Sequence, residues 1–128
     1  MQTLEQALVD AFIVPRKRDR YRSFLANEKR RAKILDELNH LHDLDHRYAT
    51  NVPSGTDVVA LLRAHGAPRK CHVISDITAL DGREMLLEDA VREAEQGIWG
   101  TLLGCIPGRL AFYFGEAGEQ HVLLERGS

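Results

Sequence analysis

The sequence lacks the residues on which several classes of protein depend. Only two cysteines, Cys71 and Cys105, occur among 128 residues. Two cysteines are too few for a disulfide-rich scaffold. They are also too far apart in the sequence for the close spacing of a zinc-binding or redox pair. We expect both to be buried free thiols. The longest clean apolar run covers residues 58–62 and is far too short to span a membrane.

The N-terminus also lacks the charge order of a secretory signal, because its apolar stretch precedes its positive charges. We therefore expect a cytoplasmic protein with no membrane partner. Apolar residues make up 44% and charged residues 28% of the chain, the balance of a soluble globular protein that can bury one core without disulfides or a structural metal. A single domain over residues 1–128 is predicted.

What is present is an uneven distribution of charge. The net charge is only −2, but residues 16–33 contain nine Lys or Arg and two acidic residues, a net charge of +7. Residues 34–128 contain eight basic and fifteen acidic residues, a net charge of −7. The chain is thus expected to have one basic and one acidic region.

The N-terminal third has the apolar spacing of helices. Residues 3–13 fit a short helix that Thr3 can cap, and Pro15 can open the next one. Residues 16–42 then fit an amphipathic helix, either continuous or divided.

A break within this second segment is indicated by two residues. Arg31 falls near the apolar side of a continuous helix, where a charged side chain is unexpected, and Asn27 can cap a new helix just before it.

Two further helices are predicted in the second half. The first is capped by Ser54 or Thr56 and ends at Gly66. The second is opened by Asp81 in a capping box and runs to about residue 96, where Gly97 can provide a left-handed stop.

Four strands complete the pattern. They are expected over residues 71–75, 101–106, 109–114 and 121–125, with a type II turn at Pro107-Gly108 and another turn over residues 115–118.

The predicted fold is α+β, with N-terminal helices packed on a small mixed sheet of β-α-β-β-β order. Residues 1–50 would form the helical layer, and residues 51–128 an α/β half that ends in a three-strand meander. Strand alternation places Tyr113 on the face opposite Phe112 and Phe114, so a second layer or a partner is expected there.

The basic segment gives the first functional hypothesis. Arg18, Arg22, Lys29 and Lys33 fall on the outer side of a continuous helix, where they could bind an acidic protein surface or the phosphates of a nucleic acid. The acidic half of a second copy is another possible partner, by self-association. Aromatic residues make up only 6% of the chain and do not alternate with these cations as a base-stacking platform requires. We therefore predict an interaction or regulatory protein that binds through a basic helix.

The heptapeptide HLHDLDH, residues 40–46, gives the alternative hypothesis. It nearly fits the histidine motifs of metallo-β-lactamases, inverzincins and HD phosphohydrolases, and fits none of them. If the segment is helical, His42 and His46 share a face and could hold a divalent metal such as zinc with His40 and Asp45. A further ligand, from His72, Asp76 or His121, would be needed. A small metal-assisted hydrolase is the alternative to a polar helix end that binds no metal.

The loop after the first strand of the second half is a third candidate. Ser75, Asp76 and Thr78 follow the carboxyl end of that strand, where ligands collect in sheets with crossover helices. The loop has no glycine-rich phosphate motif, and Ser75 lacks the G-x-S-x-G context of a nucleophile. It is therefore a possible ligand loop without a defined chemistry.

Overall fold

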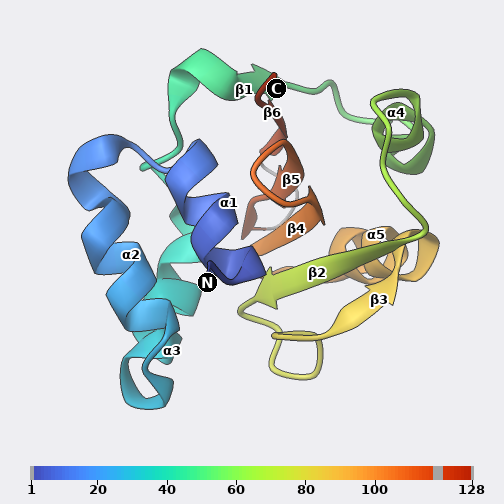
Figure 1. The fold of residues 1–128 in the computed structure, drawn as a ribbon. Helices are drawn as coiled ribbons and strands as arrows, with labels where there is room; N and C mark the ends of the chain where they lie inside the picture. The colour runs from blue at the N-terminus through green and yellow to red at the C-terminus, as the bar shows by residue number, and fades with distance from the viewer. Residues whose placement is uncertain (1, 117–119, 128) are drawn as a thin grey trace.

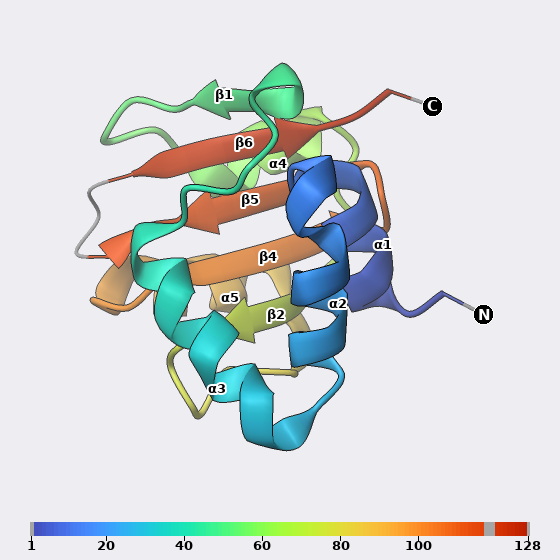
Figure 2. The same cartoon turned by 90° about the vertical axis from the view of Figure 1, so that its left-hand side faces the viewer.

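An open antiparallel sheet lies between two layers of helices in the computed structural model, which describes residues 2–116 and 120–127 (Figure 1). Figure 2 shows the first three helices lying side by side across one face of the sheet. They are α1 (Leu4–Phe12), α2 (Arg18–Leu25) and α3 (Glu28–Glu37), and the opposite face packs against α4 (Val58–Ala64) and α5 (Leu87–Gln96).

The sheet has six strands in the order β1-β6-β5-β4-β2-β3. Every neighbouring pair is antiparallel. The described residues thus form one α+β domain, which confirms the predicted class, but the predicted mixed sheet is wrong. The strands are β1 (Ala49–Asn51), β2 (Lys70–Ser75), β3 (Glu84–Leu86), β4 (Thr101–Ile106), β5 (Leu110–Phe114) and β6 (His121–Glu125).

The short strand β3, which the sequence pattern does not reveal, explains this difference. After β2 the chain turns at Gly82 (φ +78°) and returns beside β2, so that Leu86 pairs with Lys70. Helix α5 then runs back along the sheet, and β4 begins beside the end of β2, where Thr101 pairs with Ser75. A helix leading directly from β2 would have made β4 parallel; the intervening strand makes it antiparallel.

Asp81 consequently does not cap a helix, as the sequence predicted. Its Oδ1 accepts the Ser75 backbone N–H at 3.0 Å within the β2–β3 connection. Helix α4 is capped by Asp57, whose side chain accepts from the Ala60 N–H, and not by Ser54 or Thr56. Gly97 has φ −79° and is therefore not a left-handed stop.

The predicted helix starts in the N-terminal layer are confirmed. Thr3 caps α1 and forms a capping box with Gln6. Asn27 separates α2 from α3, and its side chain accepts the backbone N–H groups of Lys29 and Arg30. Pro15 opens a short 3-10 helix, η1 (Pro15–Lys17), immediately before α2.

The predicted C-terminal meander β4-β5-β6 is also confirmed. Between β4 and β5, Gly108 has φ +71° and the Arg109 N–H donates to the Ile106 carbonyl at 3.0 Å, as a Pro-Gly turn requires. Part of the second predicted turn, residues 115–118, lies outside the described residues.

Each face of the sheet is buried beneath its own layer. Tyr113 belongs to the core under α1–α3, and Phe112 and Phe114 belong to the core under α4 and α5. The second layer expected over Tyr113, on the face opposite Phe112, is therefore formed by helices α1–α3 of the same chain. No helix in the described part is long and apolar enough to cross a membrane.

Candidate functional site

The four cations predicted to form one stripe lie on two helices. Arg18 and Arg22 are in α2, and Lys29 and Lys33 are in α3, beyond the break at Asn27. The chain reverses at this break, so the two helices lie side by side (Figure 2). The pairs keep i, i+4 spacing within each helix, but the continuous stripe is interrupted.

The two cations of α2 contact the protein itself. The Arg18 Nε donates to the Ile13 carbonyl at 2.9 Å. Arg22 forms ion pairs with Asp10 of α1 and with Asp19 of its own helix. These contacts join α2 to α1 and its C-terminal end, so both side chains contribute to the packing of the helical layer.

Arg20 joins α2 to α3. Its guanidinium donates to both carboxylate oxygens of Glu37, at 2.8 and 2.5 Å. It also lies 4.9 Å from the centre of the Phe24 ring, within the range of a cation–π contact. The ion pair joins the two helices, and the ring contact, which lies within α2, helps to position the Arg20 side chain.

Arg31 is more enclosed than Arg20 or Arg22, with a side chain that is only 19% exposed. It donates to both carboxylate oxygens of Glu5 at 2.7 Å and to those of Asp81 at 2.8 and 3.1 Å. A further bond at 3.0 Å reaches the Leu25 carbonyl. Arg31 therefore joins α3 to α1 and to the β2–β3 connection.

The Glu5 carboxylate also contacts strand β2. The Nε2 atom of His72 lies 2.8 Å from Oε2 of Glu5. Burial alone would raise the pKa of Glu5, but hydrogen bonds from Arg31 and His72 outweigh it and lower the pKa to about 2. Glu5 is therefore ionised at neutral pH and is the shared acceptor of this charge cluster. Sequence reasoning missed the cluster, although the position of Arg31 on the apolar side of its helix was the available signal.

The remaining cations of α3 face solvent. Lys29, Arg30 and Lys33 are exposed, and among the described residues none of them forms an ion pair. The guanidinium of Arg30 lies 5.5 Å from the centre of the Phe24 ring. At 100° per residue these three side chains occupy about 100° of the helix surface. We call them the α3 basic face.

The histidine segment does not gather into a metal site. The helical turn η2 (Leu38–His40) ends before His42, which lies outside any helix, so the shared helical face of His42 and His46 is not formed. His40 contacts Glu116 at 2.7 Å, and both His42 and His46 are exposed.

Asp45, the carboxylate predicted to be a metal ligand, is buried and contacts Arg47 instead. It accepts hydrogen bonds from the Arg47 backbone and guanidinium, and it caps η3 (His46–Tyr48). Within the described ranges, no three His, Cys, Asp or Glu side chains come close enough to hold a metal ion. The geometry thus gives no support to a hydrolase at residues 40–46.

Side chains at the end of β2 and in the loop after it form hydrogen bonds with neighbouring segments. Ser75 is fully buried, bonds to the Thr101 hydroxyl at 2.8 Å and accepts the Ile77 N–H. Asp76 accepts a hydrogen bond from Asn39 at 2.9 Å, and Asn39 in turn accepts the Gly100 N–H. Thr78 is exposed and separate from these contacts. Each buried side-chain polar atom of the described residues has a partner, so these groups hold the loop in place.

The two cysteines are buried and not bonded to each other. Burial raises the pKa of both thiols to about 12, so neither is a reactive thiolate at neutral pH.

The fold and the charge distribution define a class only: an α+β protein with a six-stranded antiparallel sheet and a basic helical layer. Comparisons with models of protein families, with curated proteins and with solved structures gave no match.

Proposed function

We propose that this protein is an interaction or regulatory protein that binds an acidic partner through the α3 basic face. The observation that supports this function is the division of the cations. Arg20, Arg22 and Arg31 are paired with carboxylates inside the helical layer, whereas the α3 basic face has no such partner among the described residues.

The face is preorganised for binding. Asn27 fixes the first turn of α3, and the Arg20–Glu37 pair fixes its last turn against α2. Lys29 and Lys33 therefore keep a defined spacing, which reduces the conformational entropy lost on binding. Complementary charge on a partner would accelerate association and make it sensitive to salt.

An acidic protein surface suits this face better than a nucleic acid. Exposed Glu28 and Asp36 lie at the two ends of α3 and limit the positive surface to about two turns. A phosphate backbone would extend beyond those turns and meet the two acids. The aromatic side chain nearest to the cations, Phe24, lies between Arg20 and Arg30 and offers no free ring for base stacking.

A charge-reversal experiment tests this proposal. The double variant Lys29→Glu/Lys33→Glu is compared with Arg69→Glu/Arg83→Glu, which makes the same change in net charge at exposed cations outside the helical layer. Binding of a glutamate-rich peptide and of a DNA duplex is measured by anisotropy at about 50 and 200 mM salt. We expect the first double variant to lose peptide binding and the second to retain it.

The salt dependence separates the two kinds of partner. Peptide binding should weaken by several-fold over this range. A duplex bound through three phosphate contacts would lose about 40-fold in affinity. If the duplex binds more tightly than the peptide, the partner is a nucleic acid; if both double variants bind the peptide equally well, the α3 basic face is not the site.

A further inference from the structure

The ladder between β2 and β4 opens at one end. Its last paired residues are His72 and Gly104, although β2 begins at Lys70 and β4 continues to Ile106. A bulge between Gly104 and Ile106, in the pairing of β4 with β5, accompanies this separation. The two strands therefore diverge at the positions of the two cysteines, beside α1.

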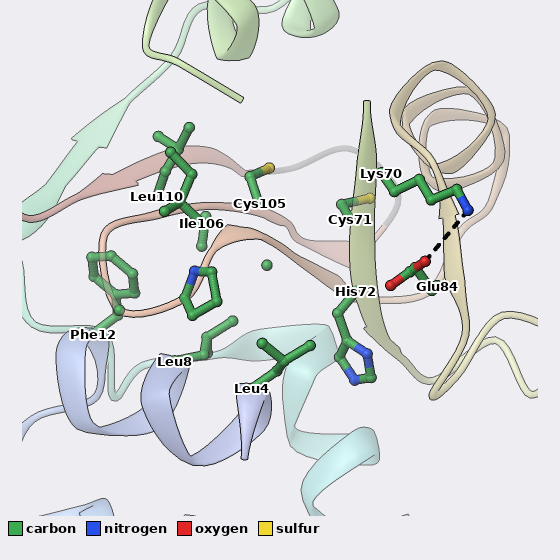
Figure 3. A pocket seen from close by; sticks show the side chains of 14 residues that line it. Leu4, Leu8, Phe12, Lys70, Cys71, His72, Glu84, Cys105, Ile106 and Leu110 are labelled. Carbon is green, nitrogen blue, oxygen red and sulfur yellow. Dashed lines mark ion pairs between the residues drawn. The ribbon is translucent and has the colours of Figure 1, made fainter. Parts of the chain in front are cut away.

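A cavity of about 110 Å³ lies at this opening (Figure 3). Leu4 and Leu8 of α1 border one side, and Cys71 and Cys105 border the opposite side. Gly104 contributes only backbone to the wall. The volume is several times the ~10–15 Å³ that one water requires on the same measure, and it is below the ~150 Å³ of an engineered apolar cavity that stays dry and binds benzene.

The charged groups around the cavity are already paired. Lys70 lies 3.6 Å from Glu84, and His72 lies 2.8 Å from Glu5. A charged ligand would have to displace one of these partners and lose its own hydration. An uncharged ligand requires neither, and its apolar surface would leave water for a wall that consists largely of aliphatic groups.

We infer that this cavity is a binding site for a small uncharged apolar molecule, no larger than a six-membered ring. The site is independent of the α3 basic face. Such a ligand would fill the space between α1 and the diverging strands, and would contact both the helical layer and the sheet.

A methyl group in the wall tests this directly. A Cβ at Gly104 would lie 3.4 Å from the Cδ1 atom of Leu8, so Gly104→Ala occupies part of the cavity. The matched control is Gly127→Ala, where a Cβ meets nothing within 4 Å. Amide resonances of both variants and of the unmodified protein are followed while benzene, phenol or benzoate is added.

We expect benzene and phenol to shift the resonances of residues 104–111 with a Kd on the order of 1 mM, in the range of a ligand of about six heavy atoms. Gly104→Ala should weaken this binding at least fivefold, and Gly127→Ala should leave it unchanged. Leu4→Ala, at an exposed position on the rim, provides a second variant that does not threaten folding and should weaken binding by several-fold. Failure of both uncharged probes to bind, unchanged affinity in Gly104→Ala and Leu4→Ala, or tighter binding of benzoate than of benzene would each overturn the inference.

Discussion

The inner and outer sides of the α2–α3 pair contain the same residue types within one short stretch of sequence, yet they differ in their contacts. On the inner side, Arg31 is shared between two carboxylates and is mostly buried. On the outer side, Lys29 and Lys33 are exposed. The difference shows that the clustered positive charge of this sequence divides into two sets. One set of cations joins secondary-structure elements, and the other is exposed and forms no ion pair among the described residues.

The largest effect is expected from removing the inner charge. Arg31→Met retains the apolar stem but leaves the Glu5 and Asp81 carboxylates without their shared cation, which should lower the free energy of unfolding by about 3 kcal/mol. Urea denaturation measures the change. The matched variant Arg30→Met, on the outer side, should change stability by less than about 0.5 kcal/mol. Equal stability of the two variants would show that the inner and outer cations do not differ.

The next effect is expected in the dependence of stability on pH. The folded pKa of Glu5 lies near 2, below its ordinary value of 4.5. Its contribution to stability is therefore complete above pH 4.5 and is lost as the pH falls towards 2. Since each pH unit between the two pKa values is worth about 1.4 kcal/mol, the loss is at most about 3.5 kcal/mol. Glu5→Gln should remove this component of the acid transition. An identical pH profile in the variant would contradict the ionised state of Glu5.

A smaller effect is expected at the half-exposed ion pair. Arg20 and Glu37 have side chains about a third exposed, so solvent screens their attraction. Arg20→Met should lower the free energy of unfolding by about 1 kcal/mol or less, through loss of the two hydrogen bonds to Glu37 and of the Phe24 contact. Thermal or chemical denaturation measures this change. If Arg20→Met destabilised the protein as much as Arg31→Met does, the stability that an ion pair contributes here would not depend on its burial.

Local sequence patterns predicted the elements that depend on neighbouring residues. The Pro107-Gly108 turn, the Asn27 break and the three C-terminal strands are of this kind, and all are confirmed. The strand β3 has only three residues, too few for a recognisable alternation, and its omission led to the wrong sheet type and the wrong role for Asp81.

The candidate site was less predictable, because the role of a cation depends on acids that are distant in sequence. Arg22 and Arg31 pair with Asp10 and Glu5 of α1. The position of Arg31 on the apolar side of its helix indicated an internal contact, but the sequence did not identify the acid that it contacts. The histidine segment illustrates the same limit. Its prediction required helical spacing, but the helical turn ends at His40, and the proposed metal ligands do not form a cluster among the described residues.

One paired measurement separates the inner from the outer cations most clearly. The free energy of unfolding and the affinity for a glutamate-rich peptide are both determined for Arg31→Met and for Lys29→Glu/Lys33→Glu. We expect opposite outcomes for the two variants. Arg31→Met should lose about 3 kcal/mol of stability and still bind the peptide, whereas the double variant should remain within about 0.5 kcal/mol of the original stability and fail to bind. A double variant that binds the peptide as well as the unmodified protein would contradict the central claim.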